Sequence, residues 1–139
     1  MAGLSKTLNE RGRCTACHLE GGTESIRKAR EHTRGFLSDA GSAISDGTVQ
    51  DVLLAVSELV TNAVQHAPGP CTLEVELDER SVRIGVTDTS DVAPVLKPPQ
   101  FNGSGGLGLH MLRTLAGDVE TQFHEGGKTV RVCLTRTAK

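Results

Sequence analysis

The chain has 139 residues, of which 37% are hydrophobic and 23% are charged, and its formal net charge is −2. This length allows one domain around a single buried core. With three Phe, no Trp and no Tyr, the chain lacks the rings on which single-stranded nucleic acids stack. It also has no long basic run that would bind DNA through counterion release. We therefore expect no direct nucleic-acid partner.

The sequence also predicts where the protein resides. No apolar stretch approaches the ~20 residues that a helix needs to cross a bilayer. Residues 1–12 contain no apolar segment like that of a signal peptide. We expect a cytoplasmic protein without a membrane contact, and in that compartment its four cysteines are reduced thiols.

The first part of the chain predicts a strand and a helix. Residues 1–12 are expected to form a flexible polar lead-in, and residues 13–139 one domain. A short strand is predicted over residues 13–19 and is closed by Gly21 and Gly22. From Thr23, apolar residues recur three or four positions apart until Gly41, which predicts an amphipathic helix.

A second helix is indicated more strongly. Asp46 and Thr48 offer N-capping oxygens, and Thr48 and Asp51 have the spacing of a capping box. Apolar residues from Val49 to Val64 make a wide buried face. The segment around Pro68 ends the helix.

The rest of the chain predicts two hairpins separated by a loop and a helix. Alternating residues at 71–77 and 81–87 indicate the first hairpin, and residues 119–124 and 129–135 the second. Between them lie a Pro- and Gly-rich loop at 89–105 and a third helix that begins near Leu107. This order of elements predicts an α+β fold: a two-layer sandwich with a mixed sheet and helices on one face.

Two polar residues on the second helix could carry chemistry. Glu58 and Asn62 are four positions apart, so a helix places them on one face. A carboxylate beside a carboxamide oxygen can orient a hydroxyl and ligate a hard cation such as Mg²⁺. A solvent-facing Glu–Asn pair remains the alternative.

Two further features follow along the chain. Asp88 ends the first hairpin and could accept a hydrogen bond from a ligand's amino group, although it could also simply begin a turn. The glycine-rich segment at 103–108 runs into a helix, where backbone N–H groups can approach phosphate oxygens. A flexible start to that helix is its alternative role.

Two familiar glycine motifs do not apply. The Gly103, Gly105 and Gly108 spacing matches a dinucleotide-binding motif, but a proline-bearing loop precedes it where a strand is required. Residues 127–129 resemble the end of a phosphate-binding loop, but position 122 is Gln where that motif needs Gly.

Taken together, these elements resemble the histidine-kinase-like ATPase superfamily, and within it the bacterial anti-sigma factor serine/threonine kinases. The resemblance runs from about residue 13 to residue 136, and its sharpest part is the segment ELVTNAVQHA at 58–67, which is similar to the family's N-box. The resemblance implies a Bergerat-like ATP-binding fold, with ATP and Mg²⁺ as cofactors.

The resemblance also assigns roles to residues. Glu58 is the implied general base, Asn62 the Mg²⁺ ligand and Asp88 the adenine-binding residue. The other implied ATP-binding residues are His66, Lys97, Gly103, Gly105, Gly106, Leu107, Gly108 and Thr129. Two departures stand out, because no glycine follows Asp88 in the family's D-x-G-x-G pattern and the loop holds Lys97 but no arginine.

The implied function is that of an ATP-binding anti-sigma protein. It would bind a sigma factor and phosphorylate a serine or threonine of a STAS-type anti-sigma factor antagonist, and homodimers are usual in the family. The alternative is a non-catalytic module whose binding to a protein partner is gated by nucleotide.

A remote alternative comes from Cys14, Cys17 and His18, which form a C-x-x-C-H string. Such a string attaches haem in oxidising compartments, and cysteines at this spacing can also bind zinc. If residues 13–19 form a strand, however, Cys14 and Cys17 point to opposite faces and cannot share one metal.

Overall fold

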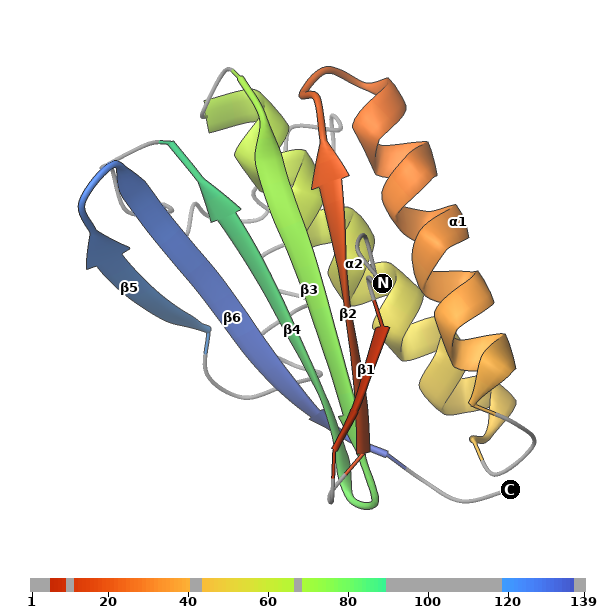
Figure 1. The fold of residues 1–139 in the computed structure, drawn as a ribbon. Helices are drawn as coiled ribbons and strands as arrows, with labels where there is room; N and C mark the ends of the chain where they lie inside the picture. Colours follow the sequence, from red (N-terminus) through yellow and green to blue (C-terminus); the bar gives the residue numbers. More distant parts are fainter. Residues whose placement is uncertain (1–5, 10–11, 41–43, 67–68, 90–118, 137–139) are drawn as a thin grey trace.

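The computed structural model describes residues 6–9, 12–40, 44–66, 69–89 and 119–136. These residues form a six-stranded sheet that two helices cover on one face (Figure 1). In chain order the elements are β1 (Lys6–Asn9), β2 (Gly12–Leu19), α1 (Glu24–Asp39), α2 (Asp46–His66), β3 (Cys71–Asp78), β4 (Ser81–Asp88), β5 (Glu120–His124) and β6 (Gly127–Thr135). The expected α+β class and two-layer arrangement are confirmed. The predicted third helix lies outside the described residues.

The strands lie in the order β1-β2-β3-β4-β6-β5, and in the described part of the chain every neighbouring pair is antiparallel. The sequence pattern predicts a mixed sheet. The difference has a simple cause, because only two residues separate β1 from β2, β3 from β4 and β5 from β6 along the chain, and strands joined so closely pair in the antiparallel sense. The two helices then return the chain so that β3 runs beside β2 in the opposite direction.

The N-terminal segment differs from the sequence expectation. Lys6–Asn9, which was assigned to a flexible lead-in, forms the edge strand β1 and pairs with β2. Gly12, assigned to the same lead-in, is the first residue of β2. A four-residue edge strand is too short for a period-2 pattern to stand out from its polar surroundings.

The start of α2 also corrects a prediction. The cap is Ser45, whose Oγ accepts a hydrogen bond from the backbone N–H of Thr48 at 3.1 Å. Asp46 is therefore the first helical residue and Thr48 the third, so neither is the N-cap. A capping box of Thr48 with Asp51 would need Thr48 as the N-cap, but Thr48 already lies inside the helix.

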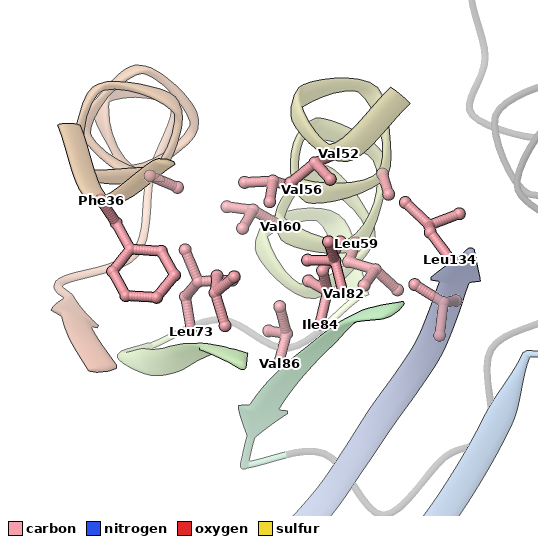
Figure 2. Close-up of a cluster of buried hydrophobic side chains, with 14 of the residues drawn as sticks. Phe36, Val52, Val56, Leu59, Val60, Leu73, Val82, Ile84, Val86 and Leu134 are labelled. Atoms are coloured by element: carbon pink, nitrogen blue, oxygen red, sulfur yellow. The ribbon is translucent and has the colours of Figure 1, made fainter. Parts of the chain in front are cut away.

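The core lies between the helical layer and the inner face of the sheet. Phe36 from α1 packs over Leu73, and Val56 and Val60 from α2 lie over Ile84 and its neighbours (Figure 2). Along β3 and β4 every second residue is buried on the inner face, and the residues between them are intermediate or exposed except for Gly85. The two helices therefore have a fixed place relative to the sheet. Within the described part of the chain, neither helix has the length and apolar character needed to cross a membrane.

Candidate functional site

The C-terminal half of α2 carries Glu58 and Asn62 one turn apart. Glu58 is half-buried and Asn62 is buried. Burial raises the pKa of the Glu58 carboxyl above its ordinary value. His66 is the last residue of the same helix, and its side chain lies outside what the structure describes. The helix thus presents a carboxyl group of raised basicity beside a carboxamide.

Contacts between the helices hold this part of α2 in place. Arg30 of α1 donates from Nη1 to Oγ of Ser57 at 2.7 Å and to the carbonyl oxygen of Leu53 at 3.4 Å. On the other side of α2, Leu59 and Val60 are fully buried against the sheet. The direction in which Glu58 projects is therefore determined by packing on both sides of the helix.

Asp88 is the last residue of β4 and lies on the inner face of the sheet, which Val82, Ile84 and Val86 also line. Thr87 pairs with Thr72, so the end of β4 lies beside the start of β3. Only residues 67–70 separate the start of β3 from the end of α2. The C-terminal half of α2 and Asp88 consequently lie at the same end of the molecule (Figure 1).

Lys128 is a further residue at this end of the fold, and no sequence motif singles it out. It faces Asp88 across β4 and β6, and its Nζ donates to both carboxylate oxygens, at 3.1 and 2.9 Å. The side chains are 0% and 1% exposed for Lys128 and Asp88. In the sequence, Lys128 stands two residues before Val130, so the alternation along this strand places it on the buried face. Its partner could not be predicted, because it depends on how β4 pairs with β6.

Thr129 is not brought to the carboxylate of Asp88. Neighbouring residues of a strand point to opposite faces, so Thr129 lies on the outer face of the sheet. There its Oγ1 is 2.8 Å from Oγ1 of Thr87 and 3.2 Å from Nε2 of His124. The structure therefore places Lys128, and not Thr129, beside the Asp88 carboxylate.

Cys71 begins β3 close to Asp88 on the inner face. Burial, followed by the negative charge of Asp88 and the neighbouring Cys17, raises the pKa of the Cys71 thiol to about 11. The thiol is therefore protonated at neutral pH and behaves as a small apolar group.

The remaining candidate residues fall outside the described part of the chain. These are Lys97 and the glycine-rich segment with Gly103, Gly105, Gly106, Leu107 and Gly108. The described part of the candidate site therefore consists of Asp88 with Lys128 and of the face of α2 that carries Glu58 and Asn62.

The C-x-x-C-H string does not assemble a site. Cys17 packs against the core from the inner face of β2, whereas Cys14 lines a groove on the outer face. Among the residues that the structure describes, no group of three or more His, Cys, Asp or Glu side chains is placed to hold a metal ion. The haem or zinc alternative is contradicted by this geometry.

The side-chain oxygens available here suit a cation that takes most of its ligands from groups outside the protein. Asn62 offers one carboxamide oxygen, and Glu58 stands one turn away. Mg²⁺ is commonly bound through one or two protein oxygens together with phosphate oxygens and water. The described residues thus fit a nucleotide-borne Mg²⁺ better than a metal held by the protein alone.

Comparison with known proteins agrees with this arrangement. The profile of the histidine kinase-like ATPase domain matches residues 20–134, a range that contains Glu58, Asn62, Asp88 and Lys128. The chain is 30% identical over 124 residues to a serine-protein kinase RsbW from Listeria innocua, covering 77% of this chain and 78% of that protein. It is 32% identical over 114 residues to a serine-protein kinase RsbW from Staphylococcus aureus, covering 69% and 70%.

A solved structure supports the fold. The chain resembles the structure of the RsbU and RsbW domains of Rv1364c from Mycobacterium tuberculosis with a TM-score of 0.66 and 23% identity. The match covers 91% of this chain and 33% of the other. With the family profile spanning most of the sequence, the chain belongs to the histidine kinase-like ATPase domain family.

Proposed function

We propose that this protein is an ATP-dependent protein serine/threonine kinase that acts as an anti-sigma factor. The observation that carries the proposal is the placement of Glu58 and Asn62 on α2 at the same end of the fold as Asp88. The similarity to serine-protein kinases RsbW supports the choice of reaction. ATP supplies the phosphoryl group, and the protein supplies positioning and a base, which is most of what phosphoryl transfer requires.

Glu58 is the general base in this proposal. It accepts the proton of a partner's serine or threonine hydroxyl as that oxygen attacks the transferred phosphoryl group. Its raised pKa, which follows from burial, makes the carboxylate a stronger base than an exposed glutamate. Contacts on both sides of α2 hold it in place, so little ordering is needed at the moment of reaction.

Asn62 binds Mg²⁺ through its carboxamide oxygen and so positions the phosphates within reach of Glu58. His66, Lys97, the segment with Gly103, Gly105, Gly106, Leu107 and Gly108, and Thr129 remain proposed nucleotide-binding residues. For Thr129 this role would have to be exerted from the outer face. Asp88 binds the adenine amino group at the other end of the nucleotide.

The partners in this proposal are a sigma factor, which the protein binds, and a STAS-type antagonist, which it phosphorylates. Both are cytoplasmic proteins, and the kinase works in the cytoplasm as a homodimer. Binding of the sigma factor and transfer to the antagonist are separable activities, so each needs its own measurement.

The test is a transfer assay. The full chain is incubated with γ-labelled ATP, Mg²⁺ and each of a panel of STAS-type antagonists, and label on antagonist serine or threonine is counted. Glu58→Gln is expected to keep ATP affinity while transfer falls by ~10²–10⁴-fold, the usual contribution of a base. Asn62→Ala is expected to weaken ATP binding measured by calorimetry in the presence of Mg²⁺.

The matched control is Glu79→Gln, an exposed glutamate in the turn between β3 and β4. It is expected to transfer at the wild-type rate. Transfer by Glu58→Gln at the wild-type rate would remove Glu58 from the role of base. ATP binding without transfer to any antagonist would favour the non-catalytic, nucleotide-gated module.

A further inference from the structure

A groove of about 450 Å³ lies between the two helices, which run side by side over the sheet (Figure 1). Its lining in the described part of the chain comes from the middle of α1 and the N-terminal half of α2. Glu58 and Asn62 lie in the other half of α2, and Asp88 lies on the sheet. The groove is therefore separate from the candidate nucleotide site, and its volume is within the usual range of ligand-binding pockets.

Arg30 is held at the wall of this groove with part of its guanidinium group unused. Its Nη1 donates to Oγ of Ser57 at 2.7 Å and to the carbonyl oxygen of Leu53 at 3.4 Å. Nε and Nη2 make no such contact within the described residues, where no buried side-chain nitrogen lacks a hydrogen-bond partner, so both atoms are open to solvent. The group is therefore fixed in position and can still donate to a ligand.

Arg34 stands one turn further along α1, lines the same groove and is exposed. Within the residues that the structure describes, neither arginine of the groove forms an ion pair, although Asp46 also lines it. Arg27 of the same helix, by contrast, is paired with Glu24 and Glu31 at 2.6 and 3.0 Å. The described lining thus has two guanidinium groups against one carboxylate, and it attracts negative charge.

The spacing of the two arginines and the apolar side chains beside them define what the groove fits. Residues four apart lie on one face of a helix and are ~6 Å apart along its axis. A second helix with two carboxylates four positions apart repeats this spacing, and arginine binds a carboxylate through two parallel N–H donors. Val49 and Leu54 of α2 line the groove and are only partly buried. Apolar side chains on that second helix would cover them, which a small anion does not do.

We infer that the groove between α1 and α2 is a docking site for an acidic amphipathic helix of a partner protein, with two carboxylates one turn apart and apolar side chains beside them. A helix laid into a groove is a recurring way of recognising a peptide segment. Charge complementarity with Arg30 and Arg34 favours this occupant over a basic or a neutral helix. The inference does not depend on the proposed kinase reaction, because the groove contains none of the residues assigned to that reaction.

The first test measures binding of a probe peptide to the full chain by fluorescence anisotropy, without nucleotide. The probe is a labelled, alanine-rich helical peptide with two Glu four positions apart and Leu residues beside them, and the matched peptide has Gln in place of both Glu. We expect the Glu peptide to bind saturably and the Gln peptide to bind about tenfold more weakly, since it lacks both charges. Added salt should weaken the Glu peptide. No saturable binding, or equal binding of the two peptides, would overturn the inference.

The second test uses Arg34→Glu. Arg34 is exposed, so thermal unfolding is expected to show an intact fold. Affinity for the Glu peptide should fall by about tenfold or more, because an attraction becomes a repulsion. The matched control is Lys28→Glu, which makes the same change of charge at an exposed position of α1 outside the described lining. The control should bind as the wild type does, and an equal loss in both variants would overturn the inference.

A labelled DNA duplex probes the other kind of anionic partner. We expect it to bind more weakly than the Glu peptide, because the phosphate backbone has no apolar side chains to cover Val49 and Leu54. Displacement of the peptide by a lower concentration of duplex than of unlabelled Glu peptide would show a general anion site and overturn the inference. Saturable binding of the Glu peptide that depends on Arg34 would support the inference even if the protein transferred phosphate to no antagonist, so the two proposals fail separately.

Discussion

Two ion pairs cross the sheet in very different surroundings. Lys128 and Asp88 join β6 to β4 on the inner face, with side chains 0% and 1% exposed and Nζ 2.9 Å from the nearer carboxylate oxygen. Arg83 and Glu76 join β4 to β3 on the outer face at the same distance of 2.9 Å, but their side chains are 54% and 43% exposed. The two ion pairs therefore have the same N–O distance but opposite degrees of burial.

The comparison shows that distance alone does not tell what an ion pair does. Water screens the outer pair and solvates each partner when the other is removed, so the pair contributes little. Water does not reach the inner pair, so each charged side chain depends on the other to offset the free-energy cost of its burial. Breaking the inner pair is therefore expected to cost more stability than breaking the outer pair.

The largest expected effect comes from breaking the inner pair. Lys128→Met leaves the Asp88 carboxylate buried without its ammonium partner, and the free energy of unfolding should fall by ~3–5 kcal/mol. Urea denaturation measures this change. The double substitution Asp88→Leu with Lys128→Met removes both charges and should be more stable than Lys128→Met alone. A cost below ~1 kcal/mol for the single change would contradict the contrast drawn between the two faces.

A smaller effect is expected at the point where β6 approaches β4 next to this pair. A Cβ on Gly127 would lie 1.8 Å from the carbonyl oxygen of Asp88, which is backbone and cannot swing away. Gly127→Ala should therefore push the strands apart and cost ~1–3 kcal/mol, as overpacking does. Gly35→Ala is the control, because Gly35 is exposed in α1 with no atom within 4 Å of such a Cβ. That control should stabilise the protein by ~0.5–1 kcal/mol.

Breaking the outer pair should matter less. Arg83→Met is expected to change the free energy of unfolding by ~1 kcal/mol or less, since both partners can turn to water. The residual contribution should shrink as salt is added, because salt screens exposed charges. Urea denaturation of Arg83→Met and wild type at low and high salt checks this, and a salt-independent loss as large as that of Lys128→Met would contradict it.

The smallest expected effect concerns Glu58, a carboxylate of intermediate burial. Burial raises its pKa in the folded protein, so the folded state holds the proton more firmly than the unfolded state. The resulting stability is present at acid pH and is lost as the pH rises through the folded pKa. Glu58→Gln cannot ionise and should therefore become more stable relative to the wild type as the pH rises. Denaturation of both proteins across the acid-to-neutral range measures the difference, with Glu79→Gln followed over the same range.

The sequence predicted the elements that depend on local patterns. The wide apolar face of α2 and the alternation along β3 and β4 appear in the structure where they were expected. The turn between those strands also follows from local chemistry, because the Asp78 carboxylate accepts from the backbone N–H groups of Arg80 and Ser81 at 2.9 and 2.8 Å. Glu58 and Asn62 could be paired from their spacing alone, and they lie on one helix.

Other features could not be predicted, because the same sequence is compatible with several local structures. Ser45, Asp46 and Thr48 are all good capping residues, and only the course of the backbone selects Ser45. Lys6–Asn9 has no pattern of its own and becomes a strand because β2 offers it an edge. The family resemblance implies a role for Thr129, whereas the pairing of β6 with β4 places the Lys128 side chain against Asp88.

By itself, then, the sequence determined the class of the fold, the extents of most helices and strands, the family, and the placement of Glu58 and Asn62 on one helix. These follow from periods of about 3.6 and 2 residues and from motifs within a few positions of one another, all of which are local. Only the tertiary structure decided what faces Asp88. Asp88 and Lys128 are 40 residues apart, and they meet because β6 pairs with β4 in one register. A shift of that register by one residue would have turned Thr129 inward in place of Lys128, since successive residues of a strand point to opposite faces.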